Sequence, residues 1–223
     1  MKTFANAWLG KGLGTNPELA TGDISRSLGP ERDFFAGFTG LAPSPLLNLR
    51  ERATELGVDA LYLKDERDRL GLGSFKALGA AYAIAKQAFA KIEAGTASDP
   101  ASALNGTTFV CASAGNHGLS LAAGARMFGA AAVVFVSETV PEAFADRLRD
   151  QGAQVVRAGA IYEDSMAEAE RQAKENGWQL LSDSTWPGMA APGRDVMEGY
   201  LIMGTEIEEQ IPEPPTHVFL QAG

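Results

Sequence analysis

The chain has 223 residues, enough for one large or two small domains, and 45% of them are hydrophobic, so it can bury a sizeable core. The formal net charge of −9 argues against nucleic acid or an anionic membrane surface as a partner. A single cysteine, Cys111, excludes an internal disulfide and fits a reducing cytoplasm, and two histidines without cysteine pairs argue against a zinc site.

The first part of the chain predicts little regular structure. Residues 1–30 are rich in Gly, Asn, Thr and Pro and have weak periodicity, which predicts an irregular arm. Neither a signal peptide nor a membrane span is predicted, because no apolar run has the required length. Two prolines predict a stiff extended segment over residues 43–47. A short helix over residues 48–56 follows and is ended by Gly57.

A predicted strand over residues 60–64 leads through a charged run, residues 65–69, into a glycine-rich loop that contains a lysine. We interpret the charged run as a solvated face and the strand end as salt-bridged. The loop reads Gly-Leu-Gly-Ser-Phe-Lys-Ala-Leu-Gly, and a helix is predicted from Ser74, a good capping residue, to about Lys91.

Lys76 falls in the first turn of this predicted helix. The helix N-terminus carries partial positive charge, so its field should lower the pKa of the lysine and favour the neutral amine. A neutral amine is what a Schiff-base nucleophile requires. Taken alone, the Ser-Phe-Lys sequence favours a solvated surface lysine over a reactive one.

After this helix, strands and helices alternate regularly. This alternation predicts a parallel sheet with helices on its faces. Strands are predicted over residues 108–112, 132–136, 154–157, 178–181 and 217–220. Helices are predicted over residues 116–128, 141–151, 162–176 and 194–210.

A second motif, Ser-Ala-Gly-Asn-His-Gly at residues 113–118, lies between a predicted strand and helix. Small residues at such a junction let backbone amides approach a ligand, and free amides at a helix N-terminus bind carboxylates or phosphates. Asn116 adds a neutral side chain that can donate and accept hydrogen bonds. By itself the motif is equally consistent with a tight turn and a capping asparagine.

Together, Lys76 and this turn resemble the pyridoxal-phosphate enzymes of fold type II, the tryptophan-synthase-β type. That family pairs Ser-x-Lys near a helix start with Ser-x-Gly-Asn-His about forty residues later. The resemblance extends to Pro-Ser-Pro-Leu at residues 43–46, Leu-Lys-Asp-Glu at 63–66 and the final residues 216–223. Within the fold, the diaminopropionate ammonia-lyase family is the most similar. Its local patterns recur at residues 71–79, 162–164 and 183–186 and in the final Gln-Ala-Gly.

The resemblance implies an α/β fold with two domains. The smaller one, residues 77–158, would carry the Asn116 turn, and the larger one, residues 1–76 and 159–223, would pack beneath it with the cofactor in the cleft. It also implies that the glycine-rich phosphate loop follows the last predicted strand, so that the chain stops before that loop. A homodimer is implied as well.

The resemblance assigns roles to particular residues. Lys76 would carry pyridoxal 5′-phosphate as a Schiff base and then take the α-proton, and Asn116 would bond the 3′-oxygen of the cofactor. The substrate carboxylate would be held by the backbone amides of the turn, with the Ser113 hydroxyl; the turn residues are Ser113, Ala114, Gly115, Asn116 and His117. The implied reaction converts a short β-substituted amino acid, most like 2,3-diaminopropionate, into a 2-oxo acid and ammonia.

Ala114 departs from the family pattern, which has an aspartate before Gly-Asn-His that is taken to serve as the base for D-substrates. Alanine cannot move a proton, and Ser-Ala-Gly-Asn-His is more similar to the L-serine and L-threonine dehydratases, which form the alternative function. Asp183 matches the second carboxylate of the family, which is proposed to act on the L-isomer. A turn aspartate bonded to nearby amides is its structural alternative. A non-catalytic fragment or a cofactor-binding protein without turnover is the alternative of another class.

Overall fold

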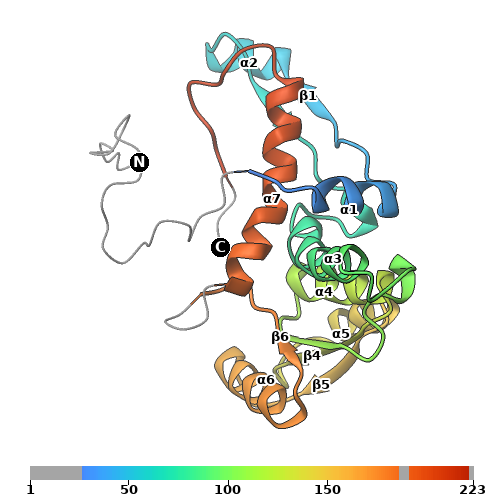
Figure 1. The fold of residues 1–223 in the computed structure, drawn as a ribbon. Coiled ribbons are helices and arrows are strands. Elements are labelled where there is room, and N and C mark those ends of the chain that lie inside the picture. The colour runs from blue at the N-terminus through green and yellow to red at the C-terminus, as the bar shows by residue number, and fades with distance from the viewer. Residues whose placement is uncertain (1–26, 186–190, 221–223) are drawn as a thin grey trace, which may run out of the picture.

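The computed structural model describes residues 27–185 and 191–220 (Figure 1). It has the α/β architecture that the alternation of strands and helices predicts. The central sheet has four parallel strands in the order β5-β4-β3-β6. These strands are β3 (Thr108–Ala112), β4 (Ala131–Val136), β5 (Gln154–Arg157) and β6 (Gln179–Leu180).

Two further strands, β1 (Leu46–Asn48) and β2 (Tyr62–Lys64), pair antiparallel and lie apart from this sheet, toward one end of the molecule (Figure 1). Short 3-10 turns occur at Arg69–Gly71 and Pro100–Ser102. The helices of the described chain are α1 (Glu31–Thr39), α2 (Arg50–Leu56), α3 (Ala77–Glu93), α4 (Asn116–Met127), α5 (Glu142–Asp150), α6 (Tyr162–Asn176) and α7 (Ala191–Gln210).

The two faces of the sheet bury alternate residues of the same strands. Phe109 and Cys111 of β3 pack into the larger core with α3 and α4, whereas Val110 and Ala112 pack on the opposite face against Ala169 of α6. This alternation follows from the two-residue period of a strand. Helices therefore cover both faces, which explains the continuous apolar runs in β3 and β4.

Most predicted elements are present within a residue or two of their expected bounds, and α6 has the predicted bounds, Tyr162–Asn176. The helix that carries Lys76 begins later than predicted, at Ala77, because residues 74–76 form a turn instead. In that turn the amide of Ala77 donates to the Ser74 carbonyl at 3.0 Å, and the Ser74 hydroxyl accepts from the Lys76 amide at 3.2 Å. Helix α1 has no counterpart in the prediction.

The prediction of a strand over residues 217–220 is wrong for the described structure. Val218, Phe219 and Leu220 are exposed and form no strand. A strand is stabilised by a neighbour that supplies hydrogen bonds and packing, and the part of the chain that the structure describes places no strand beside this segment.

The interpretation of residues 65–69 as a solvated face is also wrong in part. Asp65 and Arg67 do pair at the surface, but Arg69 is only 3% exposed and pairs with Glu66 and Glu206. The interpretation of residues 64–66 as a salt-bridged strand end is confirmed. The sequence pattern could not reveal the burial of Arg69, because its partner Glu206 lies on α7.

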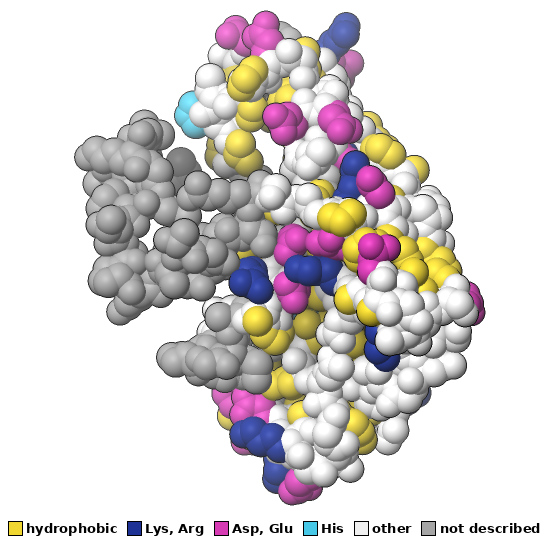
Figure 2. Space-filling model, viewed as in Figure 1, with side chains coloured by type: hydrophobic (Ala, Val, Ile, Leu, Met, Phe, Trp, Pro, Cys, Tyr) yellow, Lys and Arg dark blue, Asp and Glu magenta, His cyan; other side chains and the backbone are white. Residues whose placement is uncertain are grey.

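Several predictions fall outside the described residues: most of the irregular arm over 1–30, Trp186 in the 183–186 motif, and the final Gln-Ala-Gly. Among the helices in ranges 27–185 and 191–220, none is long and apolar enough to span a bilayer. On the face that Figure 2 shows, acidic and basic side chains are interspersed, and the middle of the face carries both kinds side by side.

Candidate active site

The candidate site lies where two neighbouring parallel strands end. Strand β3 ends at Ala112, directly before the turn at residues 113–115, and β6 ends at Leu180, shortly before Asp183. Because β3 and β6 are parallel and paired, both segments leave the sheet at the same edge. The carboxyl edge of a parallel sheet is where α/β proteins bind ligands.

Lys76 reaches this edge from the start of α3. It is the N-cap residue of α3, and its Nζ atom lies 3.0 Å from Asp183 Oδ2. The side chains of Lys76 and Asp183 are 35% and 26% exposed, so both are accessible to a ligand while remaining partly shielded from solvent. Partial burial alone would raise the pKa of Asp183, but His117 and the ion pair with Lys76 hold it below its ordinary value.

His117 links the turn to the segment that carries Asp183 through a hydrogen bond. Its ring is 2% exposed, and Nε2–H donates to the carbonyl of Leu181 over 2.9 Å. Burial lowers the pKa of His117, against the opposing effects of the Asp183 charge and the bond to Leu181. The Lys76 charge acts in the same direction as burial, so the three ionisable side chains share one neighbourhood. Within the described residues, His117 Nδ1 is buried without a hydrogen-bond partner.

The turn itself presents backbone rather than bulky side chains. Asn116 is exposed at the first position of α4, where helix amides have no acceptor inside the helix. A Cβ atom built on Gly115 would meet only Ser113 Oγ, at 3.9 Å, so the space beside this residue is open. The Ser113 hydroxyl accepts from the Gly115 amide at 3.3 Å, and Ala114 is partly buried against the core. The arrangement suits a small anion such as a carboxylate.

Two residues that the sequence patterns did not single out join α4 to the start of α3. Ser120 is fully buried; its hydroxyl donates to the Ala77 carbonyl at 2.8 Å and accepts from the Ala81 amide at 3.0 Å. Gly124 lets the helices approach, since a Cβ there would lie 2.7 Å from Ala81 Cα. The turn and the lysine are thereby held in a fixed relation. Small residues at four-residue spacing, Ser120 and Gly124, were the available sequence signal.

Two tyrosines that were not predicted as site residues are influenced by the charge of Asp183. Burial, and then the Asp183 charge, raise the pKa of both Tyr162 and Tyr200. Tyr200 of α7 packs edge-on against Phe75, the neighbour of Lys76, with ring centroids 5.2 Å apart. Only the packing of α7 on α3 brings Tyr200 here, so no local pattern could have identified it.

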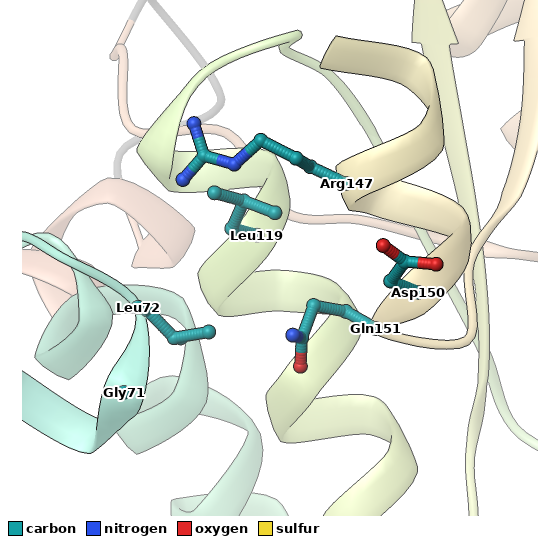
Figure 3. A pocket seen from close by; sticks show the side chains of 6 residues that line it. All are labelled: Gly71, Leu72, Leu119, Arg147, Asp150 and Gln151. Carbon is teal, nitrogen blue, oxygen red and sulfur yellow. The ribbon is translucent and has the colours of Figure 1, made fainter. Parts of the chain in front are cut away.

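A small pocket of about 110 Å³ lies nearby but apart from these residues (Figure 3). It is formed by the loop before Lys76, α4 and α5, and Figure 3 shows the Arg147 and Asp150 side chains at its border. Its lining residues are Gly71, Leu72, Leu119, Arg147, Asp150 and Gln151. None of the predicted site residues lines it, so we place the candidate site at Lys76 and Asp183 on chemical grounds. Within the described ranges, no group of His, Cys, Asp and Glu side chains is arranged to hold a metal ion.

The residues present fit pyridoxal phosphate at two points. Lys76 Nζ is an accessible amine at the start of α3, and Asn116 has an exposed amide side chain at the start of α4. The hydrogen bond of Ser120 to Ala77 links these two helices. The open space beside Gly115 leaves room for a ligand at the turn.

Comparison with protein families matches residues 38–223 to the family described as pyridoxal-phosphate dependent enzyme. The match covers well over half of the chain, and the chain therefore belongs to the pyridoxal-phosphate-dependent enzyme family. Its fold is that of the fold type II members, as the structural similarities show.

Among curated relatives, diaminopropionate ammonia-lyase of Salmonella typhimurium is 32% identical over 225 residues, which cover 95% of this chain and 55% of the relative. A chloroplastic biosynthetic threonine dehydratase of Arabidopsis thaliana is 30% identical over 180 residues, or 81% of this chain and 27% of the relative. A crystal structure of Escherichia coli diaminopropionate ammonia-lyase in complex with D-serine superposes with a TM-score of 0.75 and 29% identity, covering 91% of this chain and 56% of that one. The chain thus spans about half the length of the ammonia-lyases it matches.

Proposed function

We propose that this chain takes part in the pyridoxal-phosphate-dependent α,β-elimination of a short β-substituted amino acid similar to 2,3-diaminopropionate. The products would be a 2-oxo acid and ammonia. The observation that carries the proposal is the 3.0 Å contact of Lys76 Nζ with Asp183 Oδ2, at the sheet edge where the 113–118 turn also lies. The similarity to diaminopropionate ammonia-lyases over most of the chain supports the choice of substrate class.

Different residues of the chain would bind the cofactor and the substrate. Lys76 would hold the cofactor through its amine, and Asn116 would donate to the 3′-oxygen of the cofactor ring. When bound, pyridoxal phosphate withdraws electrons from the substrate α-carbon and so makes its hydrogen acidic. The amides of residues 113–117 and the Ser113 hydroxyl would bind the substrate carboxylate and fix the orientation of the α-carbon.

Proton transfer is assigned to Lys76 and Asp183. Once its amine is free, Lys76 Nζ would take the α-hydrogen as a proton; for the L-isomer, the family resemblance assigns this role to Asp183 instead. The electron pair left at the α-carbon then forms the double bond as the β-amino group departs with a proton as ammonia. The released unsaturated amine reacts with water to give the 2-oxo acid and a second ammonia. The 3.0 Å contact between Lys76 Nζ and Asp183 Oδ2 supports a proton exchange between these two side chains.

Ala114 supports a second candidate, a dehydratase acting on L-serine or L-threonine. An alanine at this position lacks the proton-transfer group that the diaminopropionate enzymes are taken to use for D-substrates. Similarity to a threonine dehydratase over 81% of the chain supports the same candidate. The two candidates share the roles of Lys76 and the turn and differ in the leaving group, which is an amine in one and a hydroxyl in the other.

The decisive experiment supplies the protein with pyridoxal phosphate and measures pyruvate and ammonia from L-2,3-diaminopropionate and from L-serine. We expect the diamine to react faster; the opposite order would favour the dehydratase. Lys76→Ala should abolish both activities and the visible absorption of the lysine-bound cofactor, whereas Lys174→Ala, at an exposed position of α6, should retain them. A wild-type protein with neither absorption nor turnover would support the non-catalytic alternative.

Three coarser features belong to the same proposal. We propose a cytoplasmic homodimer, supported by the family resemblance and by the one free, buried cysteine, Cys111. The division into residues 77–158 and residues 1–76 with 159–223 stays a prediction; β6 of the latter pairs with β3 of the former. Light scattering of the purified protein tests the dimer.

A further inference from the structure

A cluster of buried charges lies at the start of the loop that leads to Lys76. Arg69 donates to both carboxylate oxygens of Glu206 on α7, with Nη1–Oε1 and Nη2–Oε2 distances of 2.8 and 2.6 Å. It also donates to both oxygens of Glu66, each at 2.7 Å. Lys64 Nζ completes the cluster, 2.7 Å from Glu206 Oε2. We call Lys64, Glu66, Arg69 and Glu206 the charge cluster.

The charge cluster is balanced and shielded from water. It contains two cations and two anions, and the side chains of Arg69 and Glu206 are 1% and 3% exposed. Ser44 adds its backbone amide, which donates to Glu206 Oε2 at 3.1 Å. Ion pairs this deeply buried are weak evidence for stability, because desolvation offsets much of their attraction. Their directional, two-pronged hydrogen bonds are better suited to hold one backbone geometry.

The loop after Arg69 needs such a restraint. Leu70 has φ of 50°, which is unfavourable for a residue with a side chain, and Gly71 and Gly73 also have positive φ values. The loop thus makes a sharp, strained bend within the few residues before Lys76. Helix α7 contacts both ends of this loop, because Glu206 accepts hydrogen bonds from Arg69 and Tyr200 packs against Phe75.

We propose that Arg69 and Glu206 are positioning residues for Lys76, which fix the 70–76 loop against α7 so that the amine meets Asp183. Neither residue touches the proposed ligand. Their effect is to keep the strained loop in one conformation, and it therefore reaches Lys76 through the backbone. The functional meaning of this restraint rests on the proposed role of Lys76, but the restraint itself can be measured without any cofactor.

The experiment compares hydrogen exchange of the amides in residues 69–76 between the wild-type protein and two variants. The double variant Arg69→Met/Glu206→Leu removes one charge of each sign, so Lys64 and Glu66 remain balanced. Arg69→Lys keeps the charge but loses the two-pronged geometry. We expect exchange in the loop to become at least about tenfold faster in both, since charge-assisted hydrogen bonds are lost, while exchange in β3 and β4 stays unchanged.

Arg171→Lys is the matched control, because Arg171 makes two-pronged bonds to Glu168 and Glu175 at the exposed surface of α6. It should leave loop exchange as in the wild type. If the amides of residues 69–76 in the folded Arg69→Lys variant exchange at the wild-type rate, the proposal is overturned. This variant decides the question if the double variant does not fold.

A second readout connects the loop to the amine. Pyridoxal phosphate is trapped on lysines with borohydride, and the label at Lys76 is compared with that at Lys174. The ratio should fall in Arg69→Lys, because the loosened loop holds the amine beside Asp183 for a smaller share of the time. An unchanged ratio would contradict the positioning role. A wild-type protein that is not labelled at Lys76 would instead contradict the proposed function, while the exchange measurement would still test the restraint.

Discussion

Lys76 and Asp183 are 107 positions apart in the sequence, yet their side chains meet at 3.0 Å. The contact exists because β6 adds to the sheet beside β3, which brings the segment after β6 to the turn before α4. Both side chains are partly shielded, unlike the exposed pair of Arg171 and Glu175. An amine and a carboxylate at this distance can exchange a proton.

The first prediction concerns this pair. Asp183→Asn keeps the size of the side chain but cannot accept a proton, so elimination from an L-substrate should slow by about 10²-fold or more, which is typical of a lost general base. The measurement is kcat with L-2,3-diaminopropionate. Asp195→Asn is the control, because Asp195 pairs with Lys86 at 2.8 Å and has a similar exposure of 30%. Equal effects of the two substitutions would show that Asp183 acts only as a structural partner.

The second prediction concerns position 114. Ala114→Asp restores the carboxylate of the family turn next to the space that Gly115 leaves open. The ratio of activity on D- to L-2,3-diaminopropionate should therefore rise by about tenfold or more, as expected for an added general base. Ala114→Asn has nearly the same shape without the proton-transfer capacity and should leave the ratio unchanged. If the two variants give the same ratio, a carboxylate at this position has no part in stereochemistry.

The third prediction concerns the close packing at the start of α4. A Cβ atom on Gly118 would lie 2.2 Å from the Ser113 carbonyl oxygen, which is backbone and cannot easily move. Gly118→Ala should therefore lower the free energy of unfolding by about 1–3 kcal/mol, as measured by urea denaturation. In exposed Gly204 of α7 nothing lies near the added atom, so Gly204→Ala should raise that free energy by about 0.5–1 kcal/mol. A tolerated Gly118→Ala would mean that the turn can shift.

The fourth prediction concerns pH. Burial lowers the pKa of His117, so in the folded protein it stays neutral where the unfolded chain already binds a proton, below about pH 6.5. The unfolded state then holds more protons, and the free energy of unfolding decreases as pH falls from that value toward the folded pKa. His117→Gln should remove this part of the pH dependence, because its amide can still donate to Leu181 but does not titrate. Urea denaturation of both proteins at about pH 7.5 and about pH 5.5 measures the difference. If the free energy of unfolding decreases equally in the two proteins between these pH values, His117 is not the source of the decrease.

Local patterns were sufficient to predict most of the fold. Hydrophobic periodicity predicted β3, β4, β5 and most helices, because the buried apolar residues of each element recur at a regular spacing. The Lys76 loop and the Asn116 turn could be recognised separately, because small residues before a helix are a local signal. Helix α1 was missed, although it has buried Phe35 and two acidic residues in its first turn.

The contacts between distant segments were not accessible to the same reasoning. Arg69 stands in a run of charges that is typical of a solvated surface, and only the packing of α7 places Glu206 against it. The segment over residues 217–220 shows the converse, because an apolar run has strand propensity but forms a strand only beside a neighbour.

The sequence by itself determined the α/β class and indicated Lys76 and the 113–118 turn as candidate site residues, because these depend on short-range periodicity and on residue types within a few positions. The order β5-β4-β3-β6 decided that Asp183 meets the Lys76 amine, and the packing of α7 decided that Tyr200 lies against Phe75. Strand order and helix packing arise from burying surfaces that are far apart along the chain, and no single stretch of sequence encodes them.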